Sequence, residues 1–232
     1  WQNTPVRELL AARMPVTFQL GLMALIVALS TAIPIGIYSA IRQDTAGDYL
    51  TRSFSILMLA VPSFWMGTMV MVFPSIWWGW SPQVKFVPFT EHPVENLKQM
   101  ILPALILGMA LSAITMRLTR TMMLEVLRQD YIRTARAKGV KELTIVMRHA
   151  VRNAMVPVLT VLGPILAGLI TGSFVIEQYF AIPGIGRAFV EAVGTRDYGI
   201  IMGMTLLYAA VIASLNLVVD VSYAIANPRI RY

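Results

Sequence analysis

Long uncharged runs alternate with short polar segments along the chain. An α-helix needs about 20 predominantly apolar residues to cross the hydrocarbon core of a bilayer. The runs that approach or exceed this length are residues 14–41, 53–84, 99–116, 153–176 and 198–219. We place the second span at about 53–76, because the tryptophans that follow are typical of a membrane–water interface. The pattern therefore predicts an all-α, polytopic membrane helix bundle with five visible spans.

The segments before and after these runs carry their own signals. Thr4 and Pro5 are typical of an N-cap and a first helical position, so we expect a short, charged interfacial helix from there to about Arg13. Residues 1–13 would form a segment on the external side of the membrane. Pro228 disfavours helix at the residue before it, which predicts that the last helix stops at Asn227. The chain begins at Trp1 rather than Met, so we expect a further segment upstream.

The composition supports lipid as the main solvent. Hydrophobic residues make up 57% of the 232 residues and charged residues only 13%, about half the usual share for a soluble domain. A net charge of +7 could indicate a nucleic-acid partner, but that reading needs a polar, soluble domain. We interpret the charge as the positive-inside bias of a membrane protein and expect no nucleic acid. The absence of cysteine excludes a disulfide framework and thiolate chemistry.

The basic residues concentrate between Arg117 and Asn153. Nine of the 19 Lys and Arg residues lie in this segment. Insertion scales assign about 2.5–3.5 kcal/mol to each such residue at bilayer depth, so the segment must lie in water or at the membrane surface. With five spans, one side of the membrane receives thirteen bases and the other six. The basic segment and the C-terminus are therefore predicted to face the cytoplasm.

Helical spacing within the basic segment predicts two helices joined at Gly139. Glycine suits the left-handed conformation that ends many helices. After it, one apolar face is expected from Leu143, Val146, Met147, Ala150 and Val151. On these grounds, a segment that lies on lipid headgroups and a segment that docks a partner are equally supported.

Motifs for enzyme chemistry are missing. The sequence has no Gly-Lys dipeptide and hence no P-loop, no His-Glu-x-x-His and no Gly-x-Ser-x-Gly. Two acids, Glu177 and Asp220, lie near the ends of their runs, where we expect solvation by water rather than a proton or ion site. We therefore predict a transporter rather than an enzyme, with no catalytic residues, metal site or cofactor on this chain. Energy for uphill transport would come from another subunit.

Several motifs in order resemble one family of membrane proteins. The first is the run Asp130-Tyr131-Ile132-Arg133-Thr134-Ala135-Arg136-Ala137-Lys138-Gly139, followed by Arg148-His149-Ala150-Val151-Arg152-Asn153-Ala154 and Pro157. The second is Pro183-Gly184-Ile185-Gly186-Arg187, followed by Arg196-Asp197-Tyr198, and the third is the ending Asn227-Pro228-Arg229-Ile230-Arg231-Tyr232. Together they are similar to the permeases of ABC importers, and more narrowly to the dipeptide, oligopeptide and nickel branch. Arg133-Thr134-Ala135 and Arg152 depart from the general family signature in the way that this branch does.

The resemblance implies a type I ABC importer transmembrane domain over residues 14–232, with a cytoplasmic coupling segment at 117–153 and a sixth, N-terminal span upstream. The implied partners are a second homologous permease, two ATP-binding subunits that carry ATP and Mg, an external substrate-binding protein and membrane lipid. The implied location is the cytoplasmic membrane of a bacterium or archaeon. The implied function is to form half of the pore for di- or oligopeptides.

The same resemblance assigns residues to roles. It implies an ATPase-coupling element formed by Tyr131, Ile132, Arg133, Thr134, Ala135, Arg136, Ala137, Lys138 and Gly139. Support for this element is expected from Arg148, His149, Arg152 and Asn153, and an external loop from Pro183, Gly184, Gly186, Arg187 and Asp197. Candidates for the pore lining are Pro62, Ser63, Phe64, Trp65, Ser173 and Glu177, with core packing as the alternative for each.

Two alternatives stay open. A nickel, glutathione or opine importer of the same branch would share these motifs. A self-contained channel or secondary carrier would work without ATPase subunits, whereas a permease of this branch would be inert without them.

Overall fold

The computed structural model describes residues 5–80 and 85–226, and within these ranges the chain is helical without β-strands. The longer helices are α1 (Val6–Ile41), α2 (Ala46–Ala60), α3 (Ser63–Trp78), α4 (Pro93–Leu127), α7 (Arg152–Gly172) and α10 (Tyr198–Ala226). The shorter ones are α5 (Asp130–Ala137), α6 (Glu142–Thr144), the π-helix η1 (Ile145–Val151), α8 (Phe174–Tyr179) and α9 (Ile185–Thr195). The predicted all-α membrane bundle is confirmed.

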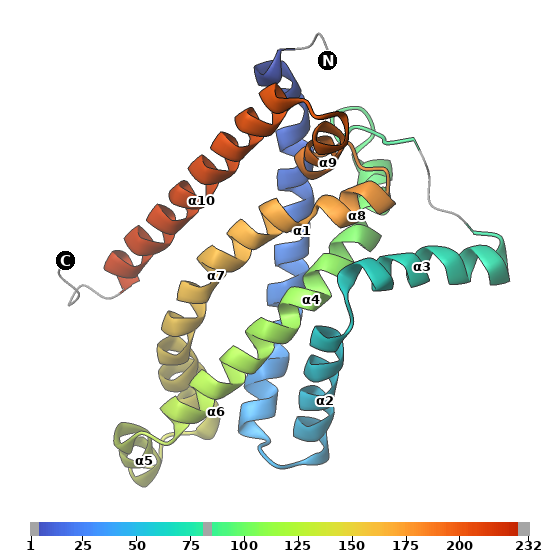
Figure 1. Ribbon diagram of the computed structural model, residues 1–232. Coiled ribbons are helices and arrows are strands. Elements are labelled where there is room, and N and C mark those ends of the chain that lie inside the picture. The colour runs from blue at the N-terminus through green and yellow to red at the C-terminus, as the bar shows by residue number, and fades with distance from the viewer. Residues whose placement is uncertain (1–4, 81–84, 227–232) are drawn as a thin grey trace.

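Helices α1 and α4 form the centre of the bundle (Figure 1). Their crossing is close because glycines lie in the contact. A Cβ atom on Gly108 would lie 2.7 Å from the Ala24 carbonyl oxygen, and one on Gly36 would lie 2.9 Å from the Met116 carbonyl oxygen. Leu20 and Met100, both fully buried, belong to the apolar cluster between the two helices. Small residues at such a crossing let backbones approach and increase van der Waals contact.

The second predicted span is broken into two helices. The chain turns by 93° between α2 and α3. Pro62 accounts for the break, because the residue before a proline is pushed out of the helical region, and Val61 is extended with ψ 118°. The span predicted at about 53–76 is therefore not one continuous helix. In Figure 1, α3 points away from the other helices, and its exposed tryptophans, Trp77 and Trp78, lie at its far end.

The first span begins earlier than expected. Helix α1 runs without interruption from Val6 to Ile41 and includes Pro15 and Pro34. Residues 6–13 therefore do not form a helix of their own, and Val6, Leu9 and Leu10 pack against α9 and α10. The external, interfacial position of this segment stays a prediction. The predicted N-cap Thr4 and the predicted stop at Asn227 lie outside the described residues.

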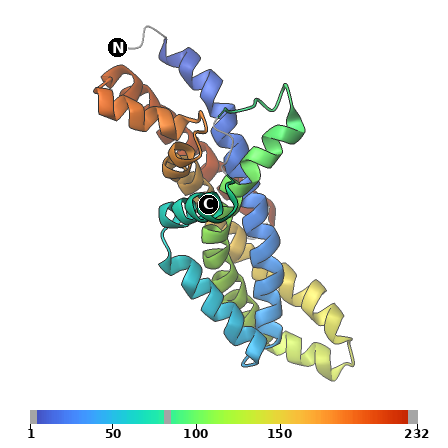
Figure 2. The same cartoon turned by 90° about the vertical axis from the view of Figure 1, so that its right-hand side faces the viewer.

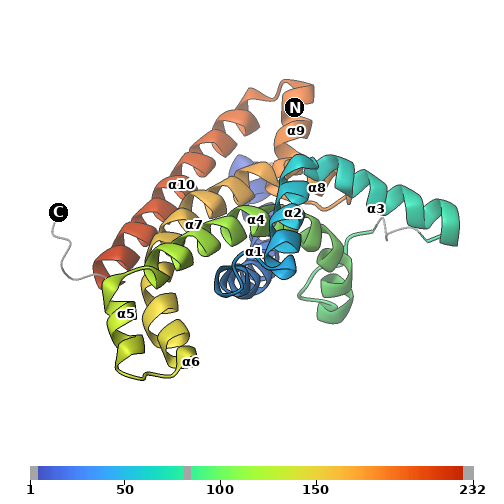
Figure 3. The same cartoon turned by 90° about the horizontal axis from the view of Figure 1, so that it is seen from below.

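Within the described ranges, three stretches are long and apolar enough to cross a membrane, namely α1, α4 and Tyr198–Val218 of α10. The bent pair α2–α3 would add a fourth. The connection between α1 and α2 and the α5–α6 region lie at one end of the bundle, and α9 with the start of α1 lies at the other (Figures 1 and 2). From below, α5 and α6 lie side by side and project from the bundle (Figure 3).

Candidate functional site

The basic segment forms a helix, a glycine turn and a second helix, as the sequence predicts. Helix α4 ends at Leu127, α5 follows from Asp130 to Ala137, and α6 with η1 leads into α7. Gly139 has φ +75°, in the left-handed region. Its amide donates to the Arg136 carbonyl at 2.9 Å, and the Val140 amide donates to the Ala135 carbonyl at 3.2 Å. These bonds satisfy carbonyl groups at the end of α5 that would otherwise lack partners.

The conformation at Gly139, not a lack of space, requires glycine. A Cβ atom built on Gly139 has nothing within 4 Å. A side chain at positive φ still brings Cβ close to the following carbonyl oxygen, which costs roughly 1–2 kcal/mol and more for a β-branched residue. Because nothing lies within 4 Å of a Cβ atom at this position, the surface around the tip of the turn is open.

An ion pair closes the turn from the other side. The Arg136 guanidinium donates to Glu142 through Nε at 3.1 Å and through NH2 at 2.6 Å. The hydrogen bond from Arg136 holds the pKa of Glu142 below its usual value, and the bond to Glu142 raises the pKa of Arg136. Both side chains are about half exposed, so solvent screens the pair and its contribution stays below about 1 kcal/mol. It fixes the relative direction of α5 and α6.

The turn is anchored to the bundle by apolar contacts. Ile132 is the buried residue of α5. Val146 and Ala150 of η1 pack in a cluster with Met123 of α4 and Ala40 of α1. The predicted single apolar face is wrong in part, because Leu143 and Met147 are 75% and 57% exposed. In η1 the wider π-helical winding separates positions that share a face in an α-helix.

The supporting residues differ in what they contact. The Asn153 side-chain amide donates to the Tyr131 hydroxyl at 2.9 Å and to the His149 carbonyl at 2.8 Å, which links α7, α5 and η1. Arg148 and Arg152 are exposed, and no hydrogen bond or ion pair of their side chains forms among the described residues. Two unpaired cations thus lie beside the start of the uncharged helix α7.

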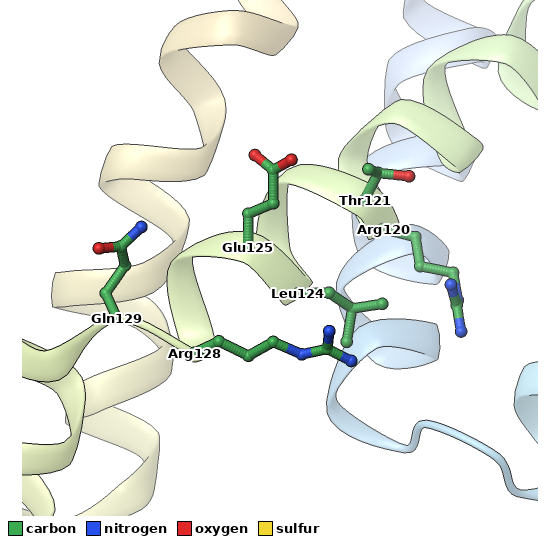
Figure 4. Close-up of a pocket in the computed structure, with 6 residues that line it drawn as sticks. All are labelled: Arg120, Thr121, Leu124, Glu125, Arg128 and Gln129. Atoms are coloured by element: carbon green, nitrogen blue, oxygen red, sulfur yellow. The ribbon is translucent and has the colours of Figure 1, made fainter.

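A shallow cavity of about 460 Å³ lies along the last turns of α4, immediately before α5. Its lining residues are Arg120, Thr121, Leu124, Glu125, Arg128 and Gln129 (Figure 4). Arg120 and Arg128 extend to the side of α4 that faces the α1–α2 hairpin, whereas Gln129 points away from it. The cavity is open, and its residues come from the end of α4 and the two residues after it. We assign no ligand to it.

The opposite end of the bundle contains a buried carboxylate. Glu177 is 0% exposed and accepts hydrogen bonds from the Thr17 hydroxyl at 2.7 Å, the Ser173 hydroxyl at 2.8 Å and the Arg187 amide at 2.9 Å. The Thr17 hydroxyl also accepts from the Ile185 amide at 2.8 Å. The Glu177 carboxyl group therefore lies at the N-terminus of α9, where helix amides lack partners within the helix and the Arg187 amide donates to it.

This network corrects the expectation that water solvates Glu177. Close contacts also explain two glycines of the loop predicted to be external. A Cβ atom on Gly184 would lie 2.4 Å from the Glu177 carboxyl carbon, and one on Gly186 would lie 2.7 Å from Cα of Phe174. Of the other residues predicted for this loop, Arg187 pairs with Glu191 at 2.9 Å and Asp197 accepts from the Ile200 amide at 3.3 Å. Pro183 directly precedes Gly184, the residue before the first turn of α9.

The pore candidates fall into two groups. Phe64 and Trp65 are about half exposed, next to Pro62 and Ser63 at the 93° break between α2 and α3. Ser173 and Glu177 are buried in the network just described, which favours the packing alternative for these two residues. The side chain of Asp220 lies outside the described residues.

Comparisons with known proteins give one answer. Residues 32–232 match the family described as "Binding-protein-dependent transport system inner membrane component". The chain is 42% identical to the oligopeptide transport system permease protein AppB of Bacillus subtilis, over 100% of this chain and 74% of that protein. It is 36% identical to the dipeptide transport system permease protein DppB of Escherichia coli K12, over 98% of this chain and 74% of that protein.

A solved structure shares the fold. The crystal structure of an amino acid ABC transporter with histidines superposes with a TM-score of 0.68, at 12% identity, over 94% of each chain. The family match covers most of the chain, and both relatives match along almost its whole length. The chain belongs to the family of inner membrane components of binding-protein-dependent transport systems.

Proposed function

We propose that this chain is the pore-forming permease subunit of an ATP-driven importer of di- or oligopeptides. Both relatives named above are permeases of peptide transport systems, one for oligopeptides and one for dipeptides. The observation that carries the proposal is the exposed helix–glycine turn–helix at one end of the bundle, in a chain without a P-loop of its own. A second, similar permease would complete the pore.

The energy would come from two ATP-binding subunits that bind ATP and Mg and dock on the turn, while an external binding protein would deliver the peptide. The positive-inside bias supports this orientation, because the basic residues of the α1–α2 connection and of the α5–α6 region gather at the same end of the bundle (Figure 1). That end would face the cytoplasm of a bacterial or archaeal cell. Helix α9 would then face the binding protein.

Residues Tyr131 to Gly139 would form the contact with the ATPase subunit. Apart from Ile132 and the half-buried Ala135, they are exposed, and two large apolar side chains, Leu143 and Met147, are exposed directly after the turn. Apolar side chains outside the membrane-spanning helices favour burial in a partner. The Tyr131–Asn153 hydrogen bond and buried Ile132 would hold α5 rigid, so that movement of the ATPase reaches the bundle.

The test is a matched pair of glycine substitutions. Gly139 and Gly79 both have positive φ, +75° and +63°, and a Cβ atom on either meets nothing within 4 Å. Valine should therefore strain both backbones to a similar extent. In proteoliposomes that contain the complete transporter, Gly139→Val should abolish peptide uptake driven by ATP, while Gly79→Val, in the connection after α3, should retain it.

The amount of assembled complex must be measured alongside, because loss of the ATPase subunits from Gly139→Val complexes is itself an expected result. Unchanged uptake and unchanged ATPase stimulation in Gly139→Val would refute the coupling role of the turn. Equal losses in both variants would show that backbone strain, and not the position of Gly139, causes the defect.

A further inference from the structure

A buried ion pair joins α2 to α4. Asp48, in the first turn of α2, is 0% exposed and accepts from Arg120 Nε at 2.8 Å and from Arg120 NH2 at 2.9 Å. The same carboxylate accepts from the Ser39 hydroxyl of α1 and from the Asp44 amide at 3.0 Å. Arg52 adds a second cation at 3.2 Å. A bidentate arginine–carboxylate contact fixes direction as well as distance.

The rest of α2 gives little to hold it in place. Its buried residues are Asp48 and Ser55, and both contact α4: the Ser55 hydroxyl lies 3.0 Å from the Met116 sulfur. Three of its large apolar side chains, Leu50, Ile56 and Leu57, are more than half exposed. The buried residue of α3 is Gly67. The first half of α3 does make apolar contacts, because Met66, Val70 and Met71 are partly buried against the cluster that contains Leu20 and Met100. The base of the α2–α3 arm (Ala46–Trp78), at the start of α2, is attached by polar contacts.

The ion pair also involves the helix that leads into the α5–α6 region. Arg120 is in the last turns of α4, which ends at Leu127, and only Arg128 and Gln129 separate this end from α5. Figure 4 shows Arg120 on the side of α4 that faces the α1–α2 hairpin. A displacement of α5 that tilts or shifts α4 would reach Asp48 directly. From Asp48 it would travel along α2 to the 93° break and α3, where the exposed pore candidates Phe64 and Trp65 lie.

We propose that the Asp48–Arg120 ion pair is the positioning contact that makes the α2–α3 arm move with α4, so that ATP hydrolysis is converted into movement of the arm. This inference rests on the proposed function. The carboxylate and the guanidinium carry the force because they join the base of the arm to α4 at the fully buried Asp48. Removing one partner of a buried pair leaves the other charge uncompensated. Arm and α4 then behave as one rigid unit.

The experiment compares Asp48→Asn with Asp44→Asn in proteoliposomes of the complete transporter. Asp44 lies in the connection just before α2, four residues from Asp48. Its side chain is 64% exposed and its ion pair with Arg52 is long, at 3.7 Å. Asp48→Asn should raise the ratio of ATP hydrolysed to peptide imported roughly tenfold. The free energy lost with the buried ion pair is larger than the free-energy change that corresponds to a roughly tenfold shift in this ratio. Asp44→Asn should keep the ratio of the unmodified complex.

A covalent substitute separates coupling from folding. Residues 1–232 contain no cysteine, so Asp48→Cys with Arg120→Cys introduces a reactive pair into a stretch that has none. Without crosslinking this variant should be uncoupled, and a short bifunctional thiol reagent should return the ratio toward that of the unmodified complex. A merely structural role would not respond to crosslinking in the assembled membrane protein.

Spin labels at Leu50 and Thr121, both exposed, report the arm itself. Their distance distribution should be narrow in the unmodified complex and broad in Asp48→Asn. Two results would refute the role of the Asp48–Arg120 ion pair and leave the proposed function intact. One is an unchanged ATP-to-peptide ratio in Asp48→Asn. The other is a crosslinked double-cysteine complex that hydrolyses ATP and imports no peptide. If the unmodified complex fails to import peptide with ATP, both the proposed function and the role of the Asp48–Arg120 ion pair are wrong.

Discussion

Replacing Gly184 with alanine tests the buried carboxylate network most sharply. The backbone at Gly184 has φ −91° and ψ −179°, an extended conformation that alanine adopts without strain. Any effect must therefore come from the added methyl group. That group would lie 2.4 Å from Cδ and Oε2 of Glu177 and 2.5 Å from the Thr17 hydroxyl oxygen, against an ordinary contact distance of 3.4 Å or more.

The cost follows from these distances. The methyl group must displace the carboxylate by about 1 Å, and overpacking a close-fitted site costs about 1–3 kcal/mol. Displacement also breaks the 2.9 Å bond from the Arg187 amide, and an unsatisfied buried donor costs about 1–3 kcal/mol. Gly184→Ala should therefore destabilise the packing of α9 on α1 and α8 by about 2–6 kcal/mol.

The assay is thermal unfolding of the purified protein in detergent, with hydrogen exchange at the amides of α9 as a local readout. The control is Gly194→Ala in the same helix, where a Cβ atom meets nothing within 4 Å. This control should be neutral or stabilising, because alanine favours helix over glycine by up to about 1 kcal/mol. A Gly184→Ala protein that unfolds like the Gly194→Ala control would contradict the geometry of the network.

Two further predictions follow from the other contacts. Arg136 lowers the pKa of Glu142, so Glu142 stabilises the turn at pH values above its ordinary pKa of 4.5, and this contribution is lost as the pH falls through the lowered pKa. Hydrogen exchange at the α5–α6 turn should therefore accelerate on acidification. Glu142→Gln should remove this pH dependence. Gly108→Val should force α1 and α4 apart, since even a Cβ atom would lie 2.7 Å from both the Ala24 oxygen and Val27 Cβ. The expected loss of stability in thermal unfolding is about 1–3 kcal/mol. A stability equal to that of the unmodified protein would argue against the close crossing.

Hydrophobic runs and glycine positions predict much of this fold. The uncharged runs give the helices and the membrane class, because lipid exposure leaves few alternatives to helix for a spanning segment. Gly139 marks the turn of the basic segment because positive φ has a strong residue preference. The break at Pro62 is also visible in the sequence, but a proline inside an apolar run does not by itself distinguish a kink from a right-angle turn.

The polar networks could not be predicted in this way. Thr17 and Glu177 are 160 residues apart, and Asp48 and Arg120 are 72 residues apart. Each of these residues is ordinary in its local sequence, and its role depends on which helices pack together. Asp48 looks like a residue of a short polar turn, and Glu177 like an acid at the end of a span, yet both are fully buried. Long-range pairing of this kind follows from tertiary structure alone.

Uptake of a labelled peptide into proteoliposomes tests the central claim most directly. The measurement compares this chain alone, the complete transporter without ATP and the complete transporter with ATP, all with the binding protein present on the external side. The account predicts accumulation against a gradient only in the third case. Peptide accumulation by this chain alone, or by the complete transporter without ATP, would contradict it.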